Sequence, residues 1–148
     1  MKTIKNPEKK IGLDGFADPT EIRKTILGML YSGQASHLGS NMSAVEMLIS
    51  IYGSIDIKRI QVGSQNRSRV LVSKGHCAAA TYATMAHYGL IEFEELKKYH
   101  QNGSLLAGHV SHAVKRVEHS TGALGHGLSV AVGCALGLRS RIVHDAPV

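Results

Sequence analysis

The sequence predicts an α/β fold, a parallel sheet flanked by helices, of which the chain holds mainly the helical part. The β component is predicted by one short apolar run at residues 69–73, Arg-Val-Leu-Val-Ser, which is typical of a strand buried on both faces. The α component is predicted by several segments with helical apolar spacing or high alanine content, bounded by capping residues and glycines. A single strand is too few for a sheet, because its backbone groups need neighbouring strands. We therefore expect the chain to hold only a helix-rich part of such a fold.

The first helix is expected to begin after Asp18. Asp18 suits the N-cap, Pro19 suits the first helical position, and Gly33 ends the helix. The apolar residues that give this helix a stripe at helical spacing are Ile22, Ile26, Leu27 and Leu30. Residues 1–17 are therefore interpreted as an N-terminal arm and residues 18–148 as one domain.

Four further helices are predicted along the domain. The first of them follows Ser43-Ala44-Val45-Glu46, which has the spacing of a capping box with Ser43 as the N-cap. The last contains glycine and alanine at close intervals, which would let it pack tightly against another backbone. The expected ranges are residues 43–53, 77–86, 92–99 and 127–138, with a polar loop before the last.

Composition and charge favour a globular protein that binds neither nucleic acid nor membranes. Hydrophobic residues make up 43% and charged residues 19% of the chain, as in ordinary globular domains. The net charge of +6 comes from lysines near the N-terminus and from scattered lysines and arginines without interleaved aromatics, which does not favour nucleic-acid binding. A basic surface would suit phosphorylated substrates and an anionic cofactor equally well. No run approaches the roughly 18 apolar residues of a membrane span, and no apolar run follows the basic N-terminus as in a secretory signal. With two widely separated cysteines, Cys77 and Cys134, we expect a reduced, cytoplasmic protein.

Four short runs, each combining glycine with histidine or with a turn, point to one ligand site. Glycine lets the backbone approach a ligand closely, and histidine can donate or accept a hydrogen bond near neutral pH. Separate loops of this kind are expected to converge on one polar ligand. The runs are His37–Ser40, Ser73–His76, Gly108–Ser111 and Ser120–Gly127.

The junction between the expected strand and the alanine-rich helix is a candidate anion site. The N–H groups at a helix start are unpaired and carry partial positive charge, so they stabilise a phosphate, and His76 could add a side-chain donor. The segment Ser73–His76 lacks the spaced glycines and the Gly-Lys-Ser/Thr ending of a nucleotide P-loop. An ordinary strand-to-helix turn with a solvent-facing His76 remains the alternative.

The other histidines and the cysteine at this junction are not expected to carry chemistry. His109 and His112 are three residues apart in a polar loop, and no His-Glu-x-x-His or Cys-x-x-Cys occurs, so a zinc site is not favoured. Cys77 is interpreted as a small buried residue rather than a nucleophile. The histidines interpreted as surface or structural residues are His87, His100, His119 and His144.

In their order and spacing, the four runs resemble the cofactor-binding N-terminal domain of transketolases, especially the split, two-subunit kind. The matching segments are Ser32–Gly39, Val72–His76, Leu106–His109 and Glu118–Gly127. Two positions depart from the family pattern, because Val110 stands where proline is usual and His126 replaces a common glutamine. Each motif alone is weak evidence for the family, whereas four motifs in the same order and spacing are specific evidence.

The resemblance implies a partial thiamine-diphosphate-binding fold and a role for each matching residue. The implied cofactor-binding residues are His76, Gly122, Ala123 and Leu124. His37 and His109 would be catalytic and would bind the sugar substrate near its carbonyl. The implied reaction is the thiamine-diphosphate-dependent transfer of a two-carbon ketol unit from a ketose phosphate to an aldose phosphate.

The resemblance also implies groups that this chain does not supply. The Mg²⁺ ligands are expected beyond Val148, so no residue of the chain is assigned to metal. The glutamate that activates the cofactor would come from a C-terminal pyrimidine-domain subunit, in a homo- or hetero-oligomer. Two alternatives remain open: a related thiamine-diphosphate enzyme of the deoxyxylulose-phosphate or dihydroxyacetone synthase type, and a non-catalytic remnant that serves as an assembly module.

Overall fold

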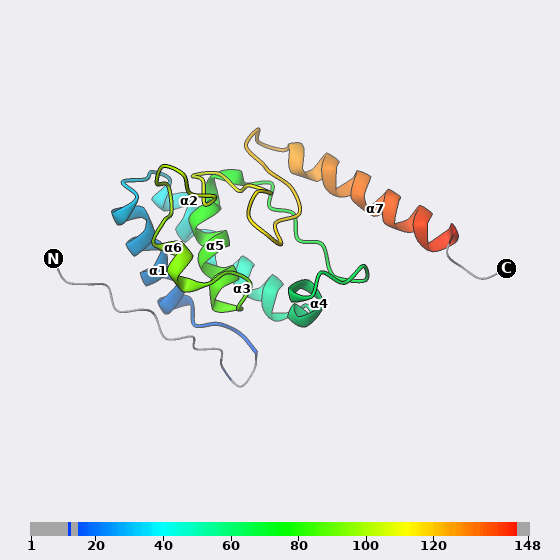
Figure 1. The fold of residues 1–148 in the computed structure, drawn as a ribbon, viewed down its shortest axis with the longest axis horizontal. Helices are drawn as coiled ribbons and strands as arrows, with labels where there is room; N and C mark the ends of the chain where they lie inside the picture. Colours follow the sequence, from blue (N-terminus) through cyan, green and yellow to red (C-terminus); the bar gives the residue numbers. More distant parts are fainter. Residues whose placement is uncertain (1–11, 13–14, 145–148) are drawn as a thin grey trace.

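The computed structural model describes residue 12 and residues 15–144, so the arm expected at residues 1–17 lies mostly outside the described part (Figure 1). The described residues form seven α-helices and one short 3-10 helix. They are α1 (Pro19–Ser32), α2 (Leu38–Met42), α3 (Val45–Gly53), α4 (Ile57–Gln61), η1 (Gly75–Cys77), α5 (Ala78–His87), α6 (Phe93–Leu96) and α7 (His126–His144). None of these helices is both long and apolar enough to cross a membrane.

Helix α1 confirms the prediction made from its ends. The Asp18 carboxylate accepts a hydrogen bond from the Thr20 amide at 2.7 Å, and Pro19 occupies the first turn. Gly33 is the C-cap, and its N–H donates to the Met29 carbonyl at 2.9 Å. A Cβ on Gly33 would lie 2.7 Å from the Tyr99 carbonyl oxygen, so this position needs glycine for close packing rather than for its backbone angle.

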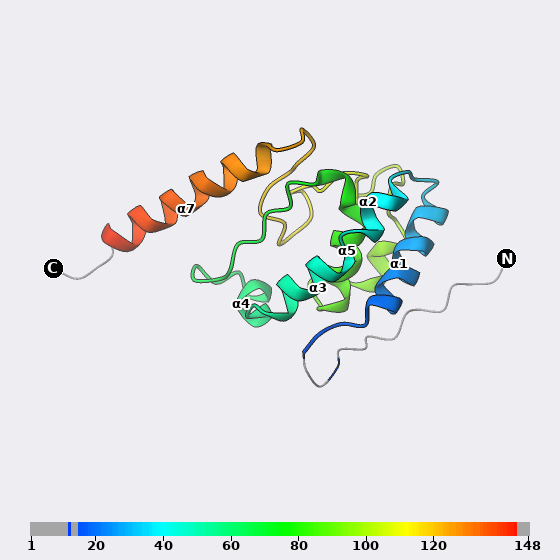
Figure 2. The ribbon, with the colours of Figure 1, turned by 180° about the vertical axis from the view of Figure 1, so that it is seen from behind.

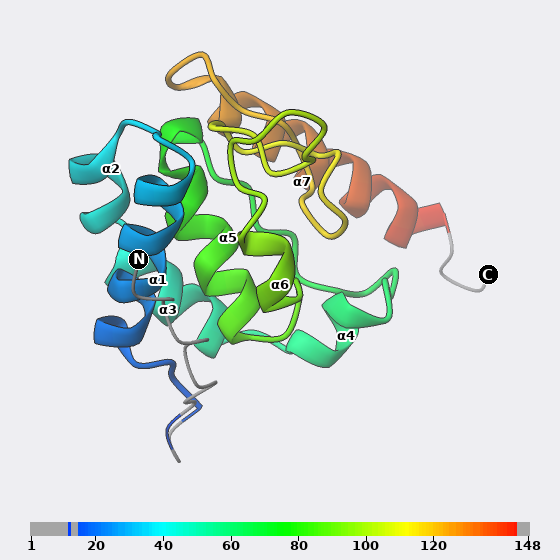
Figure 3. The same ribbon diagram turned by 60° about the vertical axis from the view of Figure 1, so that its left-hand side comes forward.

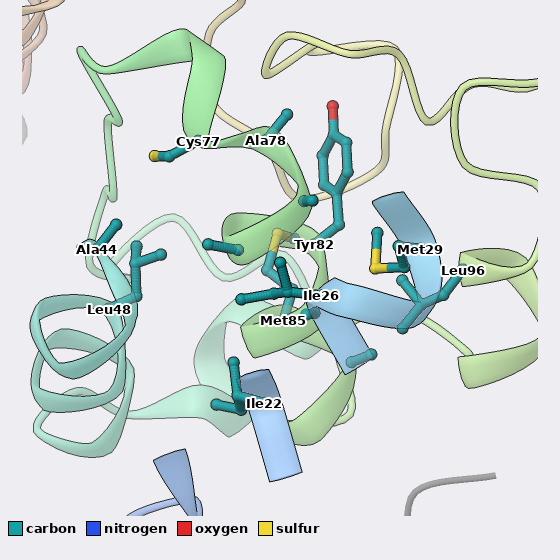
Figure 4. Packing of buried hydrophobic residues seen from close by; sticks show 14 of the residues in the cluster. Ile22, Ile26, Met29, Ala44, Leu48, Cys77, Ala78, Tyr82, Met85 and Leu96 are labelled. Carbon is teal, nitrogen blue, oxygen red and sulfur yellow. The ribbon is translucent and has the colours of Figure 1, made fainter. Parts of the chain in front are cut away.

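Helix α5 is the centre of the hydrophobic core. All of its residues are buried, and α1, α3 and α6 pack around it (Figure 3). Figure 4 shows Ile26 of α1 next to Met85 of α5, and Ile22 and Leu48 belong to the same buried cluster. Alanine side chains are small, so the neighbouring helices can approach α5 closely and fill the core with aliphatic groups. The core thus fixes the start of α5, where η1 ends.

The strand expected at residues 69–73 is not formed in the structure. This segment has no regular secondary structure and is half-buried rather than buried on both faces, and no paired strand occurs among the described residues. A parallel strand is stable only beside a neighbour that takes up its backbone groups. Here a side chain takes part of that role, because the Thr121 hydroxyl donates to the Val72 carbonyl at 2.6 Å.

The predicted capping box at Ser43 is also wrong. Helix α3 begins at Val45 with Ala44 as its N-cap and no side-chain cap. Ser43 instead ends α2, a helix that the sequence did not predict, and its hydroxyl donates to the Ser40 carbonyl and accepts from the Lys74 ammonium at 2.8 Å. The serine is therefore used to join two loops rather than to start a helix.

Helix α7 was expected at residues 127–138 and is longer than predicted. It extends away from the body of the molecule in Figures 1 and 2. A Cβ on Gly133 or Gly137 would meet no atom within 4 Å, and Leu128, Val132 and Leu136 are exposed. The tight packing predicted for its small residues is therefore not seen within the described part of the chain.

Candidate functional site

Three histidines predicted from separate motifs lie together in the structure. His37 precedes α2, His76 is in η1, and His109 is in the loop after α6. The ring centroids of His37 and His76 are 5.4 Å apart, and those of His37 and His109 are 5.6 Å apart. The expectation that these loops converge is confirmed, with His37 between the other two.

The loops that carry these histidines are joined by main-chain hydrogen bonds. The Val110 amide donates to the Gly75 carbonyl, and the Thr121 amide donates to the Val110 carbonyl, both at 3.0 Å. A Cβ on Gly75 would lie 2.4 Å from the Thr121 carbonyl oxygen, which is closer than any side chain tolerates. Gly75 is therefore required where the loops meet, and the three segments form one unit.

Helix α5 holds the His109 loop through a buried tyrosine. The Tyr82 hydroxyl donates to the His109 carbonyl at 3.1 Å and accepts from the Ser111 amide at 3.0 Å. Burial, the dominant effect, raises the pKa of Tyr82, so the phenol stays protonated and keeps its donor. The central helix of the core thus sets the position of a candidate catalytic loop.

An ion-pair cluster links Glu118, at the start of the fourth motif, to two arginines that precede the second motif. Glu118 accepts two hydrogen bonds from the Arg67 guanidinium, at 2.9 and 3.0 Å, and one from Arg69 at 3.1 Å. The three side chains are only 15–20% exposed, so the pairing is largely shielded from water. The cluster anchors the loop that continues into Gly122–Leu124.

The local environment keeps His76 neutral. Desolvation, followed by the charges of His37, Lys74 and His109, lowers the pKa of His76 below its ordinary value of 6.5. A neutral imidazole has one N–H donor and one acceptor. His76 therefore acts at neutral pH as a hydrogen-bonding group rather than as a cation.

The predicted cofactor-binding turn at Gly122, Ala123 and Leu124 is exposed at the start of α7. Leu124 is 74% exposed, and a Cβ on Gly122 would meet no atom within 4 Å. The turn is connected to the histidine group through Thr121, which bonds to the residue after His109. The turn thus lies next to the histidine loops and is exposed to solvent.

The other residues singled out in the sequence have structural surroundings. Cys77 is buried, and burial raises the pKa of its thiol, which agrees with a packing role. His87 is fully buried against Phe93 and bonds to Thr25 at 3.3 Å. The His100 ring bonds to the Gly33 carbonyl at 3.1 Å.

A second histidine pair, which the sequence did not predict, lies on the fourth motif. The rings of His119 and His126 are 5.8 Å apart, and His126 Nδ1 lies 2.6 Å from the Ala123 carbonyl oxygen. His126, at the position where glutamine is common, thus braces the turn that contains Ala123. Nearby, His112 Nδ1 lies 2.6 Å from the Ser120 hydroxyl.

Within the described part of the chain, no three His, Cys, Asp or Glu side chains are grouped so that they could hold a metal ion. The expected magnesium ligands beyond Val148 lie outside the described residues. Two residues to which the motifs assigned no role, Asn41 and Lys74, contact the histidine loops directly. No sequence signal indicates these contacts, because the partners are mainly main-chain atoms brought close only by folding.

Comparison with known proteins agrees with the geometry. The family described as the thiamine diphosphate binding domain of transketolase matches residues 20–145. The chain belongs to this family. The α/β fold of this family is therefore the fold class to which the chain belongs, although its sheet is not formed by the described residues.

The similar curated proteins include several that are named as transketolase subunits. The chain is 38% identical over 117 residues to an apulose-4-phosphate transketolase subunit of Phocaeicola vulgatus, a match that covers 77% of this chain and 41% of that protein. It is 39% identical over 118 residues to the protein of the same name from Actinobacillus succinogenes, covering 77% and 42%. It is 32% identical over 120 residues to a 6-deoxy-6-sulfo-D-fructose transketolase subunit of a Clostridium species, covering 80% and 44%. The chain thus spans less than half the length of these relatives.

Proposed function

We propose that this chain forms the N-terminal part of a split transketolase subunit. As part of that subunit it contributes to the thiamine-diphosphate-dependent transfer of a two-carbon ketol unit from a ketose phosphate to an aldose phosphate. The observation that carries the proposal is the convergence of His37, His76 and His109 from three motifs that are far apart in the sequence. Membership of the family supports it, as does the naming of the relatives as single subunits of a transketolase.

The surroundings of His76 and the 122–124 turn fit a diphosphate cofactor. His76 lies beside the start of α5, where helix geometry favours an anion, and Gly122–Leu124 are exposed to solvent. In the proposed complex, His76 donates to a diphosphate oxygen and Gly122–Leu124 lie along the cofactor rings. The charge of the diphosphate requires Mg²⁺, and the described residues include no group of side chains that could hold this ion.

His37 and His109 are placed to bind the sugar. Thiamine diphosphate, when bound, supplies the nucleophilic carbon that adds to the ketose carbonyl. The two rings, 5.6 Å apart, approach from different loops and can donate to neighbouring oxygens of one substrate. Donors fixed in this way stabilise the negative charge that develops on a carbonyl oxygen without reorganising during the reaction.

The proposal requires a partner that carries the pyrimidine-binding domain. This requirement rests on family membership and on relatives that are named as single subunits of a transketolase, while Glu118 of this chain is already paired with two arginines. The glutamate that activates the cofactor is therefore expected from that partner, in an oligomer of such pairs.

A coupled assay with a ketose-phosphate donor and an aldose-phosphate acceptor tests the proposal. It is run on the chain alone and on a mixture in which the chain, extended to the full length of its relatives, is combined with a pyrimidine-domain subunit. We expect turnover only in the complete mixture. Turnover by the chain alone would refute the partner requirement, and a complete mixture without ketol transfer would refute the proposed reaction.

Calorimetry gives a second test that does not depend on turnover. With Mg²⁺ present, the chain alone is expected to bind thiamine diphosphate weakly, because the described residues include no group of side chains that could hold the metal against the diphosphate. Tight binding by the chain alone would show that the cofactor site is complete without them.

A further inference from the structure

One buried side chain connects two of the three histidines to the central helix. Asn41 is completely buried. Its amide nitrogen donates to the His37 carbonyl at 2.9 Å and, at a longer 3.5 Å, to the His76 carbonyl. Its amide oxygen accepts from the Ala80 amide at 2.8 Å. A single group thus contacts the main chain of both histidines and the first turn of α5.

Only an amide can make this set of contacts. An asparagine amide has two N–H donors and one carbonyl acceptor, and here all of them are used. An aspartate would lack the donors, and an apolar residue would remove the acceptor of the buried Ala80 amide and the side-chain bonds to both histidine carbonyls, which is costly. The side chain is therefore specified by the backbone that it joins rather than by packing alone.

The conformation of His37 gives this contact its importance. His37 has a φ of 69°, in the left-handed region that costs a non-glycine residue on the order of 1 kcal/mol. Such a conformation persists only where the surroundings hold it. The His37 carbonyl oxygen accepts one hydrogen bond from the Asn41 main-chain amide at 3.1 Å and a second from the Asn41 side chain. Two groups of Asn41 thus hold the same oxygen.

We propose that Asn41 is a positioning residue that fixes the separation of the His37 and His76 rings. The proposal rests on the proposed function, in which one ring binds substrate and the other binds the cofactor diphosphate. Lys74 adds a second connection between the same loops, because its ammonium donates to the Ser40 carbonyl at 3.0 Å and to the Ser43 hydroxyl at 2.8 Å. The segment that follows His37 is therefore held against the His76 loop from the buried side by Asn41 and from the other side by Lys74.

The test compares Asn41→Ala with Thr84→Ala in the 148-residue chain. Thr84 is equally buried and its hydroxyl donates to the Ala80 carbonyl at 2.8 Å, yet it bonds to neither histidine, so its loss destabilises α5 without affecting the site loops. The readout is the NMR cross-relaxation between the His37 and His76 rings, with the ring chemical shifts of both. Asn41→Ala is expected to abolish the cross-relaxation and shift both rings, while Thr84→Ala keeps both signals.

Two further variants keep the test decisive if Asn41→Ala does not fold. Asn41→Ser is smaller and polar, and we expect it to lose the ring cross-relaxation. Asn41→Asp places a negative charge beside both histidines, so it should raise the pKa of His76 in an NMR titration. Wild-type cross-relaxation and ring shifts in a folded Asn41 variant would overturn the proposal, as would loss of both signals in Thr84→Ala.

In the complete enzyme, Asn41→Ala should lower kcat/KM by about 100-fold, the order of effect expected when reacting groups are displaced by about 1 Å. Thr84→Ala should leave it unchanged once the protein is folded. If the NMR result holds but the complete mixture shows no ketol transfer in the wild type, the proposed function fails while the positioning by Asn41 stands. If wild-type transfer occurs and Asn41→Ala retains full kcat/KM, the positioning role fails alone.

Discussion

Substitution of Gly75 by alanine tests whether the loops of the site form one packed unit. The added Cβ would lie 2.4 Å from the Thr121 carbonyl oxygen, 2.7 Å from the Thr121 carbonyl carbon and 3.0 Å from the Gly122 nitrogen. All three atoms belong to the main chain, so no side chain can rotate away. The loop containing Thr121 must move, and the hydrogen bonds from Val110 to Gly75 and from Thr121 to Val110 are then strained.

The expected cost of Gly75→Ala is about 1–3 kcal/mol in the free energy of unfolding, the usual range for overpacking. Urea unfolding followed by circular dichroism measures it, with Gly122→Ala as the matched control. A Cβ on Gly122 would meet no atom within 4 Å, so this control should change stability by less than about 0.5 kcal/mol. Equal stability of Gly75→Ala and the wild type would refute the close contact between the two loops.

Three further predictions concern charges around the site and core. Glu118→Gln should cost about 2 kcal/mol in urea unfolding, because it removes charged hydrogen bonds to two largely buried arginines; an unchanged midpoint would show that the cluster anchors nothing. Burial lowers the pKa of His87 in the folded state, so the unfolded chain binds more protons and stability should fall as pH drops below about 6.5. His87→Gln should reduce this slope in unfolding curves between about pH 7 and pH 5, and an identical slope would contradict the assignment. Lys74→Met removes a positive charge beside His76 and should raise the pKa of His76 in an NMR titration, whereas a decrease would refute the electrostatic account.

Local sequence signals predicted the helices that have strong ends. Asp18 and Pro19 placed the start of α1, and the alanine-rich run after Gly75 placed α5. These predictions succeeded because caps and side-chain size act within one turn of helix. The capping box at Ser43 failed because a tertiary partner, the Lys74 ammonium, takes up the same hydroxyl.

The strand at residues 69–73 shows the limit of a local pattern. An apolar, β-branched run fits a buried strand, but a strand also needs a neighbour to pair with, and the described residues provide none. The prediction that the small residues of α7 pack tightly fails for a similar reason. Small residues permit close packing, but the described residues provide no backbone against which Gly133 or Gly137 packs.

The sequence predicted that the loops of His37, His76 and His109 converge, but it did not predict the residues that hold these loops in place. His37, His76 and His109 could be found because they stand in glycine-containing motifs. Asn41 could not, because its partners are carbonyl and amide groups separated by up to 39 residues, which no sequence spacing indicates.

The most direct test of the central claim separates the three histidines in the complete enzyme. Cofactor titration and steady-state kinetics are measured for His76→Ala, His37→Ala and His109→Ala. His76→Ala should weaken thiamine diphosphate binding, since it removes a donor to the diphosphate. His37→Ala and His109→Ala should keep cofactor affinity and lower kcat by about 10²–10³-fold, as for loss of a donor to developing charge. Unchanged kinetics with lost cofactor binding in His109→Ala would contradict the account.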